Sequence, residues 1–190
     1  MRVLGISGSL RRDSFNTGLL RTAAELLPSG AELELFDGLK AIPPYDADDD
    51  VDGGPEPVRA LRGAIADADA VLVATPEYNA SIPGVLKNAL DWASRPHATN
   101  PLRGKPVAVV GASTGMFGAV WAQADARKVL STIGARVLDR ELPVAEADER
   151  FDTGGRLADA ELEEQLAETV ADLVGAAEAR AAGLAARAAA

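Results

Sequence analysis

The sequence predicts an α/β domain in which a doubly wound parallel sheet is covered by helices on both faces. Short apolar runs alternate with longer stretches of helical periodicity, which is the pattern of strands and crossover helices in such sheets. The run Ala-Val-Leu-Val-Ala-Thr at residues 70–75 is apolar enough for a strand buried on both faces. A chain of 190 residues accommodates one such domain.

Five strands are predicted in order along the chain. The first is followed by Gly8 and Ser9, and the second alternates Leu33 and Leu35 with polar residues. The fifth follows Gly134, which suits the C-terminal cap of the preceding helix. The predicted strands cover residues 2–7, 31–36, 70–75, 105–111 and 135–139.

Five helices are predicted between and after these strands. In the third, apolar residues recur at i, i+3, i+4 and i+7 from Leu86 to Ala93, and Pro83 suits its first turn. The predicted helices cover residues 16–27, 58–68, 83–94, 118–133 and the chain from about 159. We expect residues 1–178 to form the domain and the Ala-rich tail of residues 179–190 to fray.

Composition excludes several classes of protein. A net charge of −10 opposes a nucleic-acid partner, which requires a basic face. The absence of cysteine excludes disulfides, thiolate metal sites and cysteine nucleophiles. No apolar run approaches the roughly 20 residues of a membrane helix, and the start does not resemble a secretory signal. We therefore expect a cytoplasmic protein with no membrane and no nucleic-acid partner.

The loop after the first strand has the composition of a phosphate site. Serine hydroxyls, an Asn amide and two arginines precede a helix N-terminus, where backbone N–H groups and the helix dipole favour an anion. The alternative is that Ser14 or Asn16 only caps the helix while the arginines face solvent. The loop matches neither the P-loop nor the dinucleotide fingerprint, which points to a mononucleotide.

Two more loops are expected at the same edge of the sheet, because ligands of such sheets bind beyond the carboxyl ends of the strands. After the third strand, Pro76 and Pro83 stiffen a polar loop that suits the edge of a planar heterocycle. Alternatively, or in addition, Ser81 caps the next helix. After the fourth strand, residues 111–118 include three glycines that let backbone N–H groups approach a ligand closely.

Together these loops resemble the NAD(P)H-dependent FMN reductase family, which includes chromate, quinone and azo-dye reductases. The matching stretches are G-S-L-R-x-x-S-x-N at residues 8–16, P-E-Y-N at 76–79 and P-G-x-L-K-N-A-L-D-W at 83–92. Residues 151–157 also resemble the segment before the last helix of the family, so the resemblance covers roughly residues 2–174. It implies a flavodoxin-like three-layer sandwich with a five-stranded parallel sheet in the order 2-1-3-4-5.

The resemblance also implies which residues bind FMN. Those of the first loop would hold the phosphate, those of the second would border the flavin ring, and those of the third would meet its pyrimidine edge. The implied cofactor-binding residues are Ser9, Arg11, Ser14, Phe15, Asn16, Pro76, Glu77, Tyr78, Asn79, Ser113, Thr114 and Gly115. No catalytic side chain and no metal are implied, because the flavin carries the chemistry.

The third loop departs from the family pattern. The family often has paired glycines and a nearby arginine in this region. Thr114, Met116, Phe117 and Trp121 stand there in this chain.

The function implied is hydride transfer from NADPH or NADH to bound FMN, and then to a quinone, a flavin or another small acceptor by a ping-pong mechanism. A homodimer or homotetramer is also implied. One alternative is a flavodoxin-type electron carrier reduced by a partner protein, although its usual phosphate loop, T-x-T-G-x-T, does not match residues 8–16. The other is a flavodoxin-like module that binds no flavin.

Three further features are interpreted as structural. Asp48-x-Asp50-x-Asp52-Gly53 imitates the start of an EF-hand loop, but Arg59 stands at the twelfth position, which predicts a solvated acidic loop. His97 lies in a Pro-flanked loop and is expected at the surface. Trp92 is expected to pack in the core or in a subunit interface.

Overall fold

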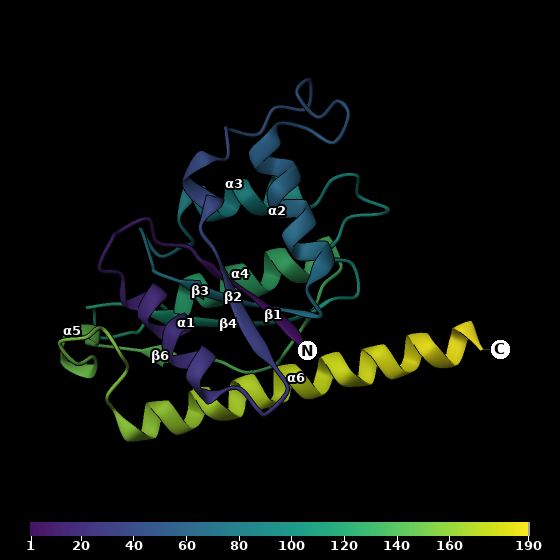
Figure 1. The fold of residues 1–190 in the computed structure, drawn as a ribbon. Coiled ribbons are helices and arrows are strands. Elements are labelled where there is room, and N and C mark those ends of the chain that lie inside the picture. The colour runs from purple at the N-terminus through teal and green to yellow at the C-terminus, as the bar shows by residue number, and fades with distance from the viewer. Residues whose placement is uncertain (190) are drawn as a thin grey trace.

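The structure, a computed structural model, describes residues 1–189. Its parallel sheet lies between two layers of helices (Figure 1). The strands are β1 (Arg2–Ser7), β2 (Glu32–Phe36), β3 (Ala70–Thr75), β4 (Pro106–Ala112), β5 (Arg136–Val137) and β6 (Pro143–Val144). The helices are α1 (Phe15–Leu26), α2 (Glu56–Asp67), α3 (Gly84–Ala93), α4 (Val120–Ile133), α5 (Ala147–Arg150) and α6 (Ala160–Ala188), with a 3₁₀ turn, η1 (Gly38–Ala41), after β2.

The strand order is β2-β1-β3-β4-β5, and every pairing is parallel. The prediction of a flavodoxin-like sheet is therefore confirmed. β3 and β4 are buried along their whole length, which explains why their sequences are almost continuously apolar. Helices α1 and α6 cover one face around Leu72 and Val110, while α2, α3 and α4 cover the other around Val73 and Val109.

The fifth strand differs from its prediction at residues 135–139. The strand found there, β5, is two residues long and pairs with the start of β4. A separate strand, β6, pairs with the end of β4 at Gly111 and Ala112. Between them the chain leaves the sheet, and its charged side chains pair with flanking helices. Glu141 pairs with Arg127 of α4 at 2.7 Å, and Arg140 pairs with Glu168 of α6 at 2.9 Å.

Helix α6 begins where predicted and continues farther than expected. The Asp159 side chain caps it by accepting the N–H groups of Glu161 and Leu162. The helix runs to Ala188, so residue 178, the predicted end of the domain, lies inside it. Its buried residues end at Ala177, and Figure 1 shows the remainder projecting beyond the sheet in yellow. Among residues 1–189, no helix combines the length and apolar character that crossing a bilayer requires.

The side chains interpreted as structural have packing roles. Trp92 is fully buried, as expected, and its indole N–H donates to the carbonyl oxygen of Pro43 at 2.9 Å. Asp50 of the acidic loop pairs with Arg62 at 2.9 Å, and His97 is exposed.

Lys105, just before β4, is a buried cation on the sheet edge opposite the three loops. Its ammonium donates to the carbonyl oxygens of Ile65, Ala66 and Ala68, which end α2 and have no intrahelical donors. Burial, and secondarily the charge of Arg180, lowers the pKa of Lys105 from 10.5 to about 8. The folded chain therefore releases this proton more readily than the unfolded chain.

This shift predicts a pH-dependent stability. Between the folded pKa of about 8 and the ordinary value of 10.5, the unfolded chain binds more protons at Lys105 than the folded chain. Below pH 8 the folded chain therefore bears the whole cost of burying the Lys105 charge. As pH rises from about 8 to 10.5 this cost disappears, so the free energy of unfolding increases. In urea titrations, the free energy of unfolding of the wild type minus that of Lys105→Met should rise with pH, by at most about 1.4 kcal/mol per pH unit. A difference that does not change with pH would contradict the shift.

Candidate functional site

A cavity of about 140 Å³ lies where the chain leaves the carboxyl ends of β1, β3 and β4. All the predicted cofactor-binding residues except Asn79 and Gly115 line it. Ala112, which the sequence alone did not indicate, lines it too. The lining residues are Ser9, Arg11, Ser14, Phe15, Asn16, Pro76, Glu77, Tyr78, Ala112, Ser113 and Thr114.

The first loop presents hydrogen-bond donors to this cavity. Ser14 is the N-cap of α1, and its hydroxyl accepts the N–H of Thr17 at 3.4 Å, so the capping interpretation is confirmed. Ser14 caps the helix and also lines the cavity. The N–H groups of Phe15 and Asn16, in the first turn of α1, have no intrahelical acceptor. The exposed guanidinium of Arg11 adds positive charge at the same place.

The amide side chain of Asn16 is engaged elsewhere. It donates to the carbonyl oxygen of Ala112 at 2.9 Å and accepts the N–H of Ala112 at 3.0 Å, and both residues are buried between α1 and the end of β4. The backbone N–H of Asn16, rather than its side chain, is therefore what remains for an anion in the cavity. The sequence motif did not distinguish these two roles.

The segment before α6 holds α1 from the other side. The rings of Phe15 and Phe151 pack with centroids 5.1 Å apart. The N–H of Leu157 donates to the hydroxyl of Thr22 at 3.1 Å. A side chain at Gly18 would meet the carbonyl oxygen of Gly155 at 2.4 Å, so this close approach requires glycine. These contacts place residues 151–157 directly against α1, the helix that follows the first loop.

The second loop is fastened to helix α4. The Glu77 carboxylate accepts the N–H groups of Trp121 and Ala122 at 3.0 and 3.1 Å, at the positive end of the helix dipole. The Ser81 hydroxyl donates to Asp125 of α4 at 2.7 Å instead of capping α3. Glu77 borders the cavity, and its carboxylate is directed to the N-terminus of α4. The loop is thereby held in place before any ligand binds.

The tip of the second loop is a tight turn. Tyr78 and Ser81 exchange two backbone hydrogen bonds of 3.0 and 3.2 Å. Asn79 and Ala80, between them, have positive φ values of 53° and 59°. Asn is one of the residues that tolerate this region. Asn79 therefore lies at the exposed tip, outside the cavity lining.

The third loop rests on β6. Ser113 donates its N–H to Val144 at 3.0 Å, and its hydroxyl accepts the N–H of Gly115 at 3.1 Å. Gly118 has a φ of 57°, and a side chain there would meet the backbone of Pro143 at 2.5 Å. The position of Ser113 and Thr114 in the cavity therefore depends on a strand that the sequence did not predict. Gly115 lies just beyond the lining.

Exposed apolar side chains lie near this cavity, and three of them, Met116, Phe117 and Trp121, stand where the sequence departs from the family pattern. Tyr78, Met116, Phe117 and Trp121 are exposed. The rings of Phe117 and Trp121 meet edge to face with centroids 4.8 Å apart. We refer to these four side chains as the aromatic rim.

The comparisons with known proteins agree with this geometry. The family model described as NADPH-dependent FMN reductase matches residues 1–149. The chain belongs to this family. It is 47% identical over 160 residues to an NAD(P)H-dependent FMN reductase of Pseudomonas aeruginosa, covering 84% of this chain and 85% of that one. It is 42% identical over 158 residues to a 2-hydroxy-1,4-benzoquinone reductase of a Burkholderia species, covering 83% and 85%.

A solved structure extends the match along the chain. The flavoenzyme NAD(P)H:(acceptor) oxidoreductase FerB of Paracoccus denitrificans is 37% identical and superposes with a TM-score of 0.81, covering 93% of this chain and 97% of that one. In this FMN reductase family member, the residues at the cavity fit the cofactor. Helix N–H groups and Arg11 suit a phosphate, and a proline-stiffened loop suits a planar ring.

The Asn16 contacts predict a large loss of stability on truncation. Asn16→Ala removes two buried hydrogen bonds and leaves both polar atoms of Ala112 unpaired. Urea denaturation should show a loss of about 2–4 kcal/mol. The control Asn79→Gly, at an exposed position with positive φ, should stay within about 0.5 kcal/mol. Equal losses in the two variants would contradict the bridging role.

Proposed function

We propose that this chain binds FMN in the cavity at the carboxyl ends of β1, β3 and β4, and there transfers hydride from NAD(P)H to a small acceptor in two half-reactions. The chemistry that FMN supplies when bound is the acceptance and release of hydride. The convergence of three loops on one cavity is the observation that carries the proposal. A single cavity implies that the nucleotide and the acceptor use it in turn.

The protein's part is to bind and to orient. Ser9, Arg11 and Ser14, with the N–H groups that begin α1, bind the phosphate. Pro76, Glu77 and Tyr78 border the flavin ring, with Asn79 at the tip of the same turn. Ser113 and Thr114 meet the pyrimidine edge, next to Gly115, where hydrogen-bond donors stabilise negative charge. No side-chain acid is needed for this chemistry.

The acceptor and the setting are also proposed. Relatives named as quinone reductases support a quinone-class acceptor for this chain. The co-substrate is NADPH or NADH, the protein is cytoplasmic, and it forms a homodimer or homotetramer. The exposed aromatic rim supports the proposed oligomer, since large exposed apolar patches mark sites of interaction.

Arg11 and Arg12 offer a matched test of the phosphate site. Both guanidiniums are exposed, but only Arg11 lines the cavity. Arg11→Gln should weaken FMN binding about 10- to 100-fold, because a charged hydrogen bond to the phosphate is lost. Arg12→Gln should change it less than about twofold. Titration of FMN fluorescence measures both, and equal effects would place the phosphate elsewhere.

Steady-state kinetics test the shared cavity. With NADPH and a benzoquinone varied together, the two half-reactions should give parallel double-reciprocal lines. High quinone concentrations should inhibit competitively with NADPH, since both ligands enter the same cavity. Intersecting lines would mean that both substrates are bound together, which contradicts the single-cavity proposal.

A further inference from the structure

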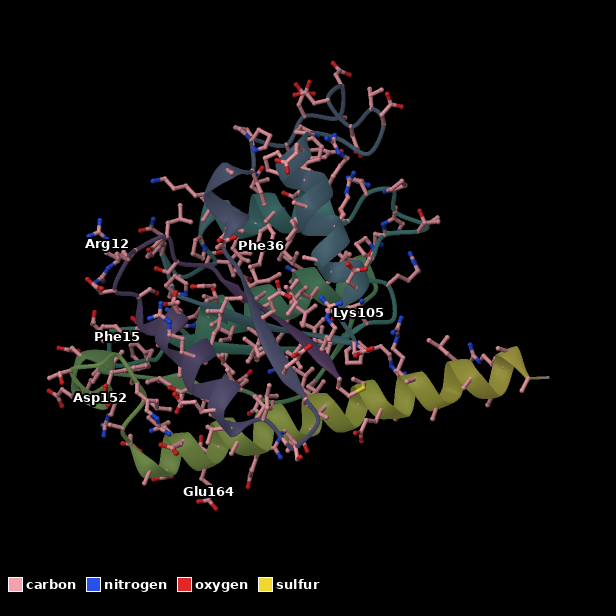
Figure 2. The ribbon with its side chains drawn as sticks, in the orientation of Figure 1. Arg12, Phe15, Phe36, Lys105, Asp152 and Glu164 are labelled. Atoms are coloured by element: carbon pink, nitrogen blue, oxygen red, sulfur yellow. The ribbon has the colours of Figure 1, made fainter. Side chains whose placement is uncertain are left out.

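A second charged feature lies far from the FMN cavity. A groove of about 280 Å³ separates the projecting part of α6 from the turns that precede β4 and β5. Four arginines line it: Arg103, Arg136, Arg180 and Arg187. They belong to the end of the sheet where β4 and β5 begin, whereas the FMN cavity lies where β1, β3 and β4 end. Figure 2 shows Lys105, which precedes β4, and Arg12, in the first loop, on opposite sides of the molecule.

The four arginines come from two joined turns and from one face of α6. Gly104 donates its N–H to the carbonyl oxygen of Gly134 at 2.8 Å, and Arg136 donates its N–H to that of Lys105 at 2.9 Å. These bonds join the two turns and set Arg103 beside Arg136. Arg180 and Arg187 are seven residues apart, so they lie on one face of α6. The groove thus combines three segments that are distant in sequence.

The charges of this groove have no carboxylate counterpart. In the described part of the chain, none of the four arginines forms an ion pair, whereas Arg127, Arg140 and Arg156 each pair with carboxylates. No acidic residue lines the groove. The chain nevertheless has a net charge of −10, so a cluster of four unpaired cations is not a consequence of composition.

Like charges are also crowded next to the groove. The positive charge of Arg180 contributes to the lowered pKa of the buried Lys105. The carboxylates that raise the pKa of Lys105 are those of Asp67, at the end of α2, and Asp69, between α2 and β3. Neither lines the groove. Repulsion among these cations lowers the stability of the empty groove, and a bound anion would offset it.

One of the residues that line the groove, Gly183, is a glycine inside a helix. It stands in an Ala-rich helix, where glycine costs about 0.5–1 kcal/mol relative to alanine. Packing does not explain it, because a side chain there would meet no atom within 4 Å. Gly183 does line the groove, so a methyl group would occupy space that a ligand needs. Gly175, in the same helix, has equally open surroundings and does not line the groove.

We propose that this arginine groove is a binding site for a diphosphate anion, separate from the FMN cavity. The Arg103 guanidinium donates one N–H to the carbonyl oxygen of His97 at 3.1 Å, and its other N–H groups remain for a ligand. Together the four guanidiniums supply enough N–H donors for two phosphate groups, each held by a bidentate arginine and a second cation. The same chemistry is present in inorganic pyrophosphate and in the diphosphate of a nucleotide. The ligand is a small anion rather than a nucleic acid, because the chain has a net charge of −10 and the groove is short.

Isothermal titration of the FMN-loaded protein with inorganic pyrophosphate, and separately with ADP, tests the site. Saturable binding that weakens with added NaCl is expected. Equal affinities would mean that the groove recognises the diphosphate alone, and tighter binding of ADP would mean that it also recognises the nucleoside. Arg136→Gln and Arg180→Gln should each weaken binding about tenfold or more, while Arg21→Gln, an exposed arginine on α1, should not.

The glycine pair separates binding from folding. Gly183→Ala and Gly175→Ala should both raise the melting temperature, because each adds a helix-favouring residue. Only Gly183→Ala should also weaken pyrophosphate binding. Absence of saturable binding by both anions, or binding that Arg136→Gln and Arg180→Gln leave unchanged, would overturn the proposal. These two outcomes leave the proposed FMN site untouched, because FMN binding is measured separately by the flavin absorbance of the FMN-loaded protein.

Discussion

The pair of hydrogen bonds between the Asn16 side chain and the Ala112 backbone fixes the geometry on which the candidate site depends. β1 and β4 are not neighbours in the sheet, since β3 lies between them. The Asn16 amide therefore reaches across the end of β3 and ties the first loop to the third. All of its polar atoms are buried and satisfied, so loss of this contact is costly and the arrangement is rigid. The two ends of the proposed FMN site are thereby held at a set separation.

The remaining loop is held by a different device. Glu77 uses its carboxylate to satisfy the first N–H groups of α4, and Ser81 bonds the same helix. An acidic residue at the edge of a site for an anionic cofactor would ordinarily repel it. Here two N–H groups and the positive end of the helix dipole offset part of that repulsion while they hold the loop in position. The three loops are thus preorganised by contacts that involve no ligand.

Much of this architecture follows from local sequence patterns. The apolar run of β3 and the i, i+3, i+4 spacing of α3 predict their elements to within a residue or two, because burial dictates both patterns. The loop motifs at residues 8–16 and 76–79 indicate the cavity residues, since strands of a doubly wound sheet present their following loops at one edge.

Other features depend on contacts between distant segments. β6 is two residues long and exists because it pairs with the end of β4, so no periodicity reveals it. The roles of Asn16 and Glu77 depend on Ala112 and on the N-terminus of α4, which lie 96 and about 44 residues away. The helical continuation of α6 beyond Ala177 has no buried residue, so the helix propensity of alanine rather than burial accounts for it.

The central claim is that one cavity holds FMN and receives hydride directly from a nicotinamide nucleotide. Anaerobic stopped-flow mixing of the FMN-loaded protein with NADPH, and separately with NADH, tests it most directly. The flavin absorbance near 450 nm should disappear fully and rapidly with at least one nucleotide, with no other protein present. An FMN-loaded protein that keeps its absorbance with both nucleotides would instead be an electron carrier, and a protein that does not take up FMN would contradict the site itself.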